Sequence, residues 1–325
     1  MDIKAVAEYV APQMSRVMDL VRSSLESDID LLNKTNEVML GSGKRIRPML
    51  SILMALAISK GLVTDDTIRF AAASELLHNA TLLHDDVVDN SPVRRGAPTV
   101  MSILGGSASV LLGDYWLVKA MDRILEARSN SARVIRIFAK TLSDLAEGEM
   151  LQMQKASDGD TSESDYLRII YSKTASLFEA SALSAAISVG ASESMRKAAS
   201  VYACNIGTAF QIRDDMLDYM EGNSTGKPAG QDLDEQKITL PLLGAMRGDP
   251  SREAEIRALV RGISDNPSAK ASVMEYVRTG GGMEYAAKKL EGYVSMAIFS
   301  LREFPEGPAR DALETLARYI GGREE

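Results

Sequence analysis

The chain has 325 residues, of which 45% are hydrophobic and 25% are charged, and its formal net charge is −8. This hydrophobic content is ample for a buried core, whereas the negative charge argues against a nucleic-acid partner. Cys204 is the single cysteine, which excludes an intrachain disulfide and fits a reducing, cytoplasmic compartment. We expect no signal peptide and no transmembrane segment, because the longest nearly apolar run, residues 48–59, is too short to span a bilayer.

Helical patterns dominate the chain, and alternating strand patterns are scarce. Helices are predicted over about 3–25, 28–40, 48–60, 64–89, 106–127, 131–155, 162–189 and 192–220. Beyond a Gly/Pro loop at 222–230 the pattern is helical again, with breaks at 248–250, 266–267, 280–282 and 305–308. No linker or low-complexity segment divides the chain, so we expect a single all-α domain over residues 1–325.

The helix predicted over 64–89 ends in a cluster of carboxylates, Asp85, Asp86 and Asp89. Helical spacing puts Asp85 and Asp89 on one face, one turn apart, with Asp86 beside them. Three carboxylates so close repel one another unless a cation lies between them. Oxygen ligands suit a hard ion such as Mg²⁺, which commonly binds a phosphate as well.

Two arginines follow this cluster closely, since Pro92 breaks the helix and Arg94 and Arg95 come next. Guanidinium groups beside a carboxylate–metal cluster suggest a phosphorylated substrate. Taken alone, however, the pattern is equally compatible with an acidic helix end followed by a basic turn.

The same spacing recurs at Asp214, Asp215 and Asp218, again at the end of an apolar helix and again followed by a lysine, Lys227. Two such motifs, each trailed by cations, favour a metal-bound phosphate substrate. A helix C-terminus is the negative end of the helix dipole, which also favours cations there. If the two helix ends face each other across a cavity, six carboxylates could hold several metal ions.

A dense cationic loop lies near the N-terminus, where Lys44, Arg45 and Arg47 follow Gly43. Glycine lets the backbone approach a phosphate closely, so we interpret this loop as a diphosphate site. The alternative is a basic surface turn.

Four more residues are candidates for ligand contact. His78 lies two turns before the first acidic motif and close to the same face, where a structural role and a binding role are equally compatible. Lys173, followed by Thr174, lies mid-helix among small residues and is costly to bury without an anionic partner. Gln211 precedes the second acidic motif by three residues and shares its face.

Together with the segments 43–48, 173–174 and 226–233, the two acidic motifs make the chain resemble the trans-polyprenyl diphosphate synthases, the head-to-tail isoprenyl transferases. The resemblance extends from about residue 30 to 320 and is greatest to the long-chain octaprenyl and solanesyl types. It implies an isoprenoid-synthase helical bundle around a central cavity and a homodimer. It also implies condensation of isopentenyl diphosphate with an allylic diphosphate, with Mg²⁺ as the cofactor.

The resemblance also implies a role for each matching position. The residues that would bind Mg²⁺ and hold the allylic diphosphate are Asp85, Asp86, Asp89, Asp214, Asp215 and Asp218. Direct contact with that diphosphate is implied for Arg94, Lys173, Thr174, Gln211 and Lys227. The residues implied to form the isopentenyl diphosphate pocket are Gly43, Lys44, Arg47, His78 and Arg95. Lys237 matches the last conserved lysine of the second loop, although Gln236 stands where the family commonly has glycine.

A long product is expected because Ala80 and Thr81, one turn before the first acidic motif, are both small. In the family an aromatic residue at either position stops chain growth early. Phe138 is the first aromatic residue on the helix face that it shares with Gln152, about 21 Å away at ~1.5 Å per residue. Phe138 is therefore our candidate for the floor of a product tunnel, the alternative being an ordinary core residue. The product itself could enter the membrane.

Four alternatives stay open. A shorter-chain farnesyl or geranylgeranyl diphosphate synthase would share every motif. A terpene cyclase ionises the same kind of substrate, but two full acidic motifs and a second cationic pocket argue against it. A non-catalytic partner subunit should lack acidic residues that are all present here. A helical scaffold without chemistry is the fourth.

Overall fold

The computed structural model describes residues 1–325 except 41–42, 95, 221–228 and 323–325. Helices make up most of the described chain, so the all-α prediction is confirmed. One short antiparallel hairpin, β1 (Val93–Arg94) with β2 (Ala97–Pro98), was not predicted. Within the described residues we find no helix with both the length and the apolar character that a membrane span needs. The chain divides into two compact units, each made of several segments, and the single-domain expectation stays a prediction.

The first unit comprises residues 1–139, 177–200 and 301–316. Its elements besides the hairpin are α1 (Ile3–Ser24), α2 (Asp30–Leu40), α3 (Ile46–Ser59), α4 (Asp65–Val88), α5 (Val100–Leu104), α6 (Gly106–Leu125), the start of α7 (Ser131–Asp158), α9 (Ser176–Ser188), the start of α10 (Glu193–Asp218), η3 (Leu301–Glu303) and most of α16 (Pro308–Gly322).

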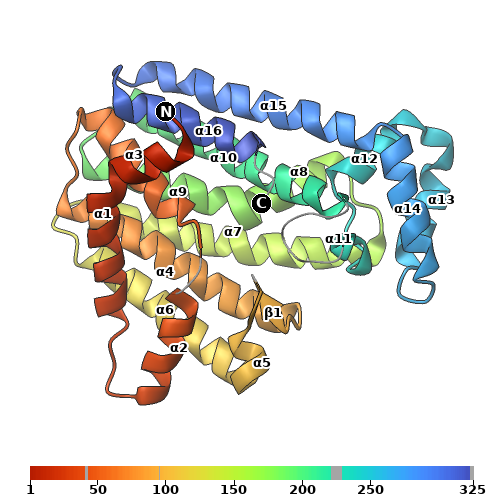
Figure 1. The fold of residues 1–325 in the computed structure, drawn as a ribbon, viewed down its shortest axis with the longest axis horizontal. Coiled ribbons are helices and arrows are strands. Elements are labelled where there is room, and N and C mark those ends of the chain that lie inside the picture. The colour runs from red at the N-terminus through yellow and green to blue at the C-terminus, as the bar shows by residue number, and fades with distance from the viewer. Residues whose placement is uncertain (41–42, 95, 221–228, 323–325) are drawn as a thin grey trace. The chain divides into compact units, whose positions relative to one another are not determined.

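Helix α4, which ends in the first acidic motif, is the central element of this unit. Its N-terminus is closed by a reciprocal capping box between Thr64 and Thr67, which satisfies helix N–H groups that lack an intrahelical partner. Helices α1, α3 and α6 pack against it, and Figure 1 shows α6 running alongside α4. The approach of α6 is close because Gly113 has no side chain, and a Cβ there would lie 2.3 Å from His84 Nε2.

Two hydrogen bonds of the buried Asn36 side chain connect α6, α2 and the end of α1 in this core. Trp116 of α6 is fully buried, and its Nε1 donates to Oδ1 of Asn36 at 2.8 Å. Asn36 in turn donates through Nδ2 to the carbonyl of Leu25, so it ties α2 to the end of α1. These bonds leave the indole and amide groups satisfied inside an apolar core, as burial requires.

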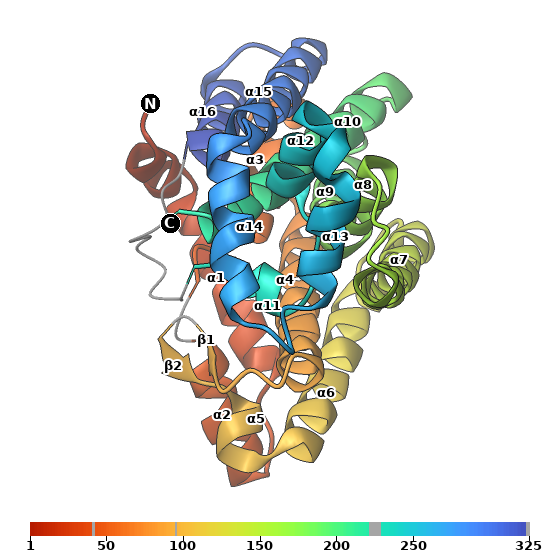
Figure 2. The same ribbon diagram turned by 90° about the vertical axis from the view of Figure 1, so that its right-hand side faces the viewer.

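The second unit comprises residues 140–176, 201–300 and 317–325, described here to residue 322. Besides the later parts of α7, α10 and α16, its elements are α8 (Glu163–Ile170), η1 (Tyr171–Ala175), α11 (Gln231–Asp234), α12 (Leu240–Gly248), η2 (Pro250–Arg252), α13 (Glu253–Arg261), α14 (Ser268–Thr279) and α15 (Gly282–Ser300). Helix α12 packs on α15, and α13 packs beside α14, as Figure 2 shows.

The predicted helix over 162–189 is interrupted by a turn of π-helix, η1, which contains Lys173 and Thr174. A π-turn inserts one extra residue into an α-helix and is frequently found at functional sites. Helix α7 lies close to this turn, because Gly148 has no side chain and a Cβ there would lie 2.6 Å from Ser172 Cβ. The turn thus rotates Lys173 and Thr174 relative to the α-helical positions that the sequence predicted.

Candidate active site

The second acidic motif lies at the C-terminal end of α10, and its Asp215 lines a cavity of about 130 Å³ in the second unit. The polar lining of this cavity includes Lys173, Gln211 and Asp215, which were predicted to belong to the site. Asp232 and Lys237 line it as well. The structure therefore brings together side chains that lie more than 60 positions apart in the sequence.

Asp215 is the most deeply buried acid of this cavity, with 4% of its surface exposed. One carboxylate oxygen accepts a hydrogen bond from the hydroxyl of Tyr166 at 2.7 Å, and the other accepts one from Gln211 Nε2 at 2.8 Å. Burial raises the pKa of Asp215 well above its usual range, and the charge of Asp232 raises it further, while the two hydrogen bonds act in the opposite direction.

Two further carboxylates of the second unit, Asp218 and Asp232, interact with each other. Asp218 accepts hydrogen bonds from the backbone N–H groups of Gln231 and Asp232, both at 3.0 Å, and so holds the first turn of α11. Burial raises the pKa of Asp218. Burial and the charge of Asp218 raise the pKa of Asp232 from 3.8 to about 7. The charges of Lys237 and Lys173 lower the pKa of Asp232 but do not offset these causes.

The raised pKa values show that the charged forms of these buried carboxylates are disfavoured. A divalent cation that prefers oxygen ligands would stabilise them, so the residues present fit such an ion. In the residues that the structure describes, no three acidic or histidine side chains are already gathered at metal-binding distance. Among the residues predicted to bind Mg²⁺, Asp214 and Asp218 are both partly buried.

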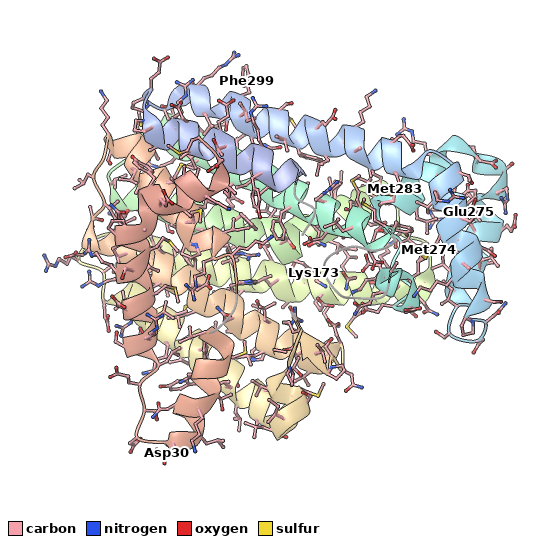
Figure 3. All side chains as sticks on the ribbon, in the orientation of Figure 1. Asp30, Lys173, Met274, Glu275, Met283 and Phe299 are labelled. Carbon is pink, nitrogen blue, oxygen red and sulfur yellow. The ribbon has the colours of Figure 1, made fainter. Side chains whose placement is uncertain are left out.

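Lys173 has the anionic partner that its burial requires. Its Nζ lies 2.5 Å from Oε2 of Glu149 on α7, and Gln152 donates from Nε2 to the other oxygen of Glu149 at 3.2 Å. Figure 3 labels Lys173 beside the ribbon of α7. The neighbouring Thr174 donates through its hydroxyl to Gln211 Oε1 at 2.7 Å. Gln211 is therefore fixed at both ends, by Thr174 and by Asp215.

Lys237 follows α11 and lines the cavity with its side chain. Its backbone N–H donates to the carbonyl of Asp232 at 2.8 Å, and its ammonium group pairs with Glu235. The preceding residue, Gln236, has φ = +57°, so it retains a backbone conformation that glycine favours. Lys227, predicted to contact the allylic diphosphate, lies outside the described residues.

The first acidic motif, at the end of α4 in the first unit, is bound to the unpredicted hairpin. Asp86 is 1% exposed, and its Oδ1 accepts a hydrogen bond from Arg94 Nε at 2.7 Å. The hairpin turns the chain back after Pro92 and so brings Arg94 to this carboxylate. Asp85 is partly exposed and Asp89 is exposed at the helix end.

The predicted isopentenyl diphosphate residues also belong to the first unit. Gly43 has φ = +140°, a conformation that side chains disfavour, and Lys44 is exposed. The guanidinium carbon of Arg47 lies 4.6 Å from the ring centroid of Phe178, a cation–π contact. His78 is partly exposed on α4. Arg95 lies outside the described residues.

The predicted chain-length residues differ in burial. Ala80 is 1% exposed, Thr81 is partly exposed, and Phe138 on α7 is fully buried. The hydroxyl of Thr81 donates to the backbone carbonyl of His78 at 2.8 Å. The expectation that the ends of the two acidic helices face each other across a cavity stays a prediction.

Sequence reasoning missed Tyr166, which binds Asp215 and lines the same cavity. The local signal was limited to the helix start, where Ser162 and Asp165 form a capping box. That signal places Tyr166 in the first turn of α8 but does not identify a partner 49 positions later.

The comparisons with known proteins agree with this fold. The family model described as polyprenyl synthetase matches residues 29–277. The chain therefore belongs to the polyprenyl synthetase family. The predictions of family, helical fold and prenyl-transfer chemistry are confirmed.

Individual relatives resemble the whole chain. The octaprenyl diphosphate synthase of Escherichia coli (strain K12) is 38% identical over 327 residues, with 100% of both chains covered. The all-trans-nonaprenyl-diphosphate synthase (geranyl-diphosphate specific) of Rhodobacter capsulatus is 34% identical, covering 95% of this chain and 94% of that one. A solved polyprenyl synthase from Caulobacter crescentus CB15, complexed with calcium and isoprenyl diphosphate, has a TM-score of 0.91 at 34% identity, covering 100% of this chain and 98% of that one.

Proposed function

We propose that the chain is a long-chain trans-polyprenyl diphosphate synthase, which condenses isopentenyl diphosphate with an allylic diphosphate primer. The observation that carries this proposal is the cavity of the second unit, where Lys173 and Lys237 line the same space as Asp215 and Asp232. Ammonium groups bind phosphate oxygens, and carboxylates hold the metal ion that a diphosphate brings with it. The octaprenyl and nonaprenyl names of two relatives support a long product.

The proposed cofactor is Mg²⁺, which would be held by the carboxylates Asp85, Asp86, Asp89, Asp214, Asp215 and Asp218. When bound, it would neutralise the charge of the allylic diphosphate and so favour its departure. The raised pKa values of Asp215 and Asp218 support a cation there. The calcium named with the Caulobacter crescentus structure supports a divalent ion.

The chain's own residues would bind and orient the leaving diphosphate. Lys173, oriented by Glu149, would place its ammonium group on a phosphate oxygen, and Thr174 and Gln211 would supply hydrogen bonds beside it. The C–O bond of the allylic diphosphate breaks, and the electron pair leaves with the diphosphate. Apolar side chains in the cavity lining, Ile169 and Ile170 among them, would keep water away from the resulting carbocation.

The double bond of isopentenyl diphosphate then attacks C1 of the carbocation, and loss of a proton completes the new isoprene unit. The released diphosphate is the proposed proton acceptor. The isopentenyl diphosphate pocket is proposed at Gly43, Lys44, Arg47, His78 and Arg95. The positive φ of Gly43 supports this assignment, because glycine permits a close approach of the backbone to a phosphate.

We propose a homodimer whose contact includes α6. Three large apolar side chains of this helix are strongly exposed, Leu111 at 69%, Val118 at 57% and Leu125 at 59%. Their spacing of seven residues puts them in one stripe along the helix. Exposed apolar stripes are unusual on monomers, so we propose that a second copy of the chain covers this one.

We also propose a cytoplasmic location, and the observation that supports it is the single cysteine.

The test is product analysis with purified protein, labelled isopentenyl diphosphate, an allylic primer and Mg²⁺. We expect long all-trans products, whereas a terpene cyclase would leave isopentenyl diphosphate unused and a partner subunit would be inactive alone. Asp85→Ala and Asp214→Ala should lower turnover by orders of magnitude while the circular dichroism spectrum stays unchanged. Asp265→Ala, which changes an exposed acid of the second unit, is the matched control. Near-normal turnover in both motif variants would contradict the proposal.

A further inference from the structure

Gln236 has a disfavoured backbone conformation, and its side chain forms hydrogen bonds to a distant part of the chain, which we call its tether. It lies in the turn between α11 and α12 with φ = +57°, a conformation that costs a side-chain-bearing residue free energy and that glycine adopts readily. Its side-chain Nε2 donates to the backbone carbonyl of Arg261 at 2.8 Å and to Ser264 Oγ at 3.2 Å. The side chain thus binds the C-terminal end of α13, a distant element in the sequence.

The turn that Gln236 anchors forms one wall of the candidate active site. Its backbone N–H donates to the carbonyl of Leu233 at 3.0 Å, and the next N–H, that of Lys237, donates to the carbonyl of Asp232 at 2.8 Å. Lys237 and the residues that follow it, Ile238 and Thr239, line the cavity. This turn therefore sets the backbone position from which the Lys237 side chain reaches the cavity.

Helix α13 is itself fixed to a second part of the cavity wall. Arg257 donates through its guanidinium to the carbonyls of Gly159 and Thr161, both at 3.1 Å. Thr161 lines the same cavity. The anchor point of Gln236 is therefore a braced helix, and Figure 2 shows this helix together with α11 and α14. An ion pair between Asp234 and Lys270, at 2.7 Å, adds a further link between α11 and α14.

We propose that Gln236 is a positioning residue for Lys237. Its amide holds the turn against α13 and so fixes the place of the Lys237 ammonium group in the cavity. A glycine at this position would fit the backbone without strain but would leave the turn without these side-chain hydrogen bonds to α13 and Ser264. This inference rests on the proposed function, because it assigns the diphosphate of the substrate as the group that Lys237 meets.

The experiment compares Gln236→Gly, which removes both the strain and the tether, with Gln236→Ala, which removes only the tether. Lys60→Gly is the matched control, because Lys60 has nearly the same φ, +59°, at the exposed end of α3. Two measurements are made on the full chain. One is amide hydrogen exchange of residues 235–239 without ligand, and the other is a steady-state separation of KM for the allylic diphosphate from kcat.

We expect both Gln236 variants to exchange these amides roughly fivefold faster, the effect of losing about one net hydrogen bond, and to raise KM by a similar factor. Lys60→Gly should change neither quantity. Unchanged exchange and unchanged KM in Gln236→Ala would overturn the proposal, because this variant loses the side-chain hydrogen bonds and keeps the disfavoured backbone conformation. If the wild-type protein forms no prenyl product, the proposed function fails, but the exchange measurement still decides whether Gln236 holds the turn.

Discussion

Asp232 makes the stability of the metal-free protein depend on pH in an unusual direction. Burial and the charge of Asp218 raise the pKa of Asp232 from 3.8 to about 7. An acid whose pKa is higher in the folded protein contributes most stability below its unfolded pKa, and this contribution is lost as the pH rises through the folded pKa. At about 1.4 kcal/mol per pH unit the loss between pH 4 and pH 7 is about 4 kcal/mol. Because the side chain is not completely buried, we expect about 2–4 kcal/mol.

The perturbation is Asp232→Asn, which keeps the shape of the side chain but removes its charge. The assay is urea unfolding in the presence of EDTA at pH 5 and pH 8. Between pH 5 and the folded pKa of about 7 only about two pH units remain, so the variant should gain about 1–3 kcal/mol over the wild-type protein at pH 8 relative to its difference at pH 5. Asp265→Asn, an exposed acid, should follow the wild-type pH dependence. Adding Mg²⁺ at pH 8 should stabilise the wild-type protein more than Asp232→Asn. An equal difference between variant and wild type at both pH values would refute the reasoning.

Three further predictions concern binding, product length and assembly. Arg94→Gln should mainly raise KM for the allylic primer and Arg95→Gln that for isopentenyl diphosphate; steady-state kinetics with equal effects on both substrates would refute this division. Ala80→Tyr should shorten the product and Phe138→Ala should lengthen it in mass analysis. An unchanged product length in Ala80→Tyr would refute the assignment of the product tunnel. An unchanged product length in Phe138→Ala would refute only the assignment of Phe138 as the floor of that tunnel. Leu111→Asp should convert the dimer into a 35.2 kDa monomer in light scattering, and a wild-type monomer at micromolar concentration would contradict the dimer.

The fold was largely predictable because its signals are local. The helix predicted over 64–89 begins where the structure has the capping box of α4, at Thr64. Glycine and proline breaks separated the helices after residue 230 as the structure has them. Two features were not predictable in this way. The hairpin at 93–98 has strands of two residues, too short for an alternating pattern. The π-turn η1 lies where α7 approaches closely at Gly148, a contact between helices that the local sequence does not indicate.

In the candidate site, too, the local features could be predicted and the long-range contacts could not. The aspartates follow a spacing that helical geometry turns directly into a shared face, so their grouping could be read from neighbouring positions. The contacts that hold them could not, because they join residues far apart in the chain. Tyr166 reaches Asp215 across 49 positions and Gln236 reaches Arg261 across 25, and each bond depends on how helices pack. At position 236 the resemblance indicated only that a glutamine stands where the family commonly has glycine. The structure has the glycine-like backbone, and the side chain that disfavours that backbone also supplies the hydrogen bonds that hold it.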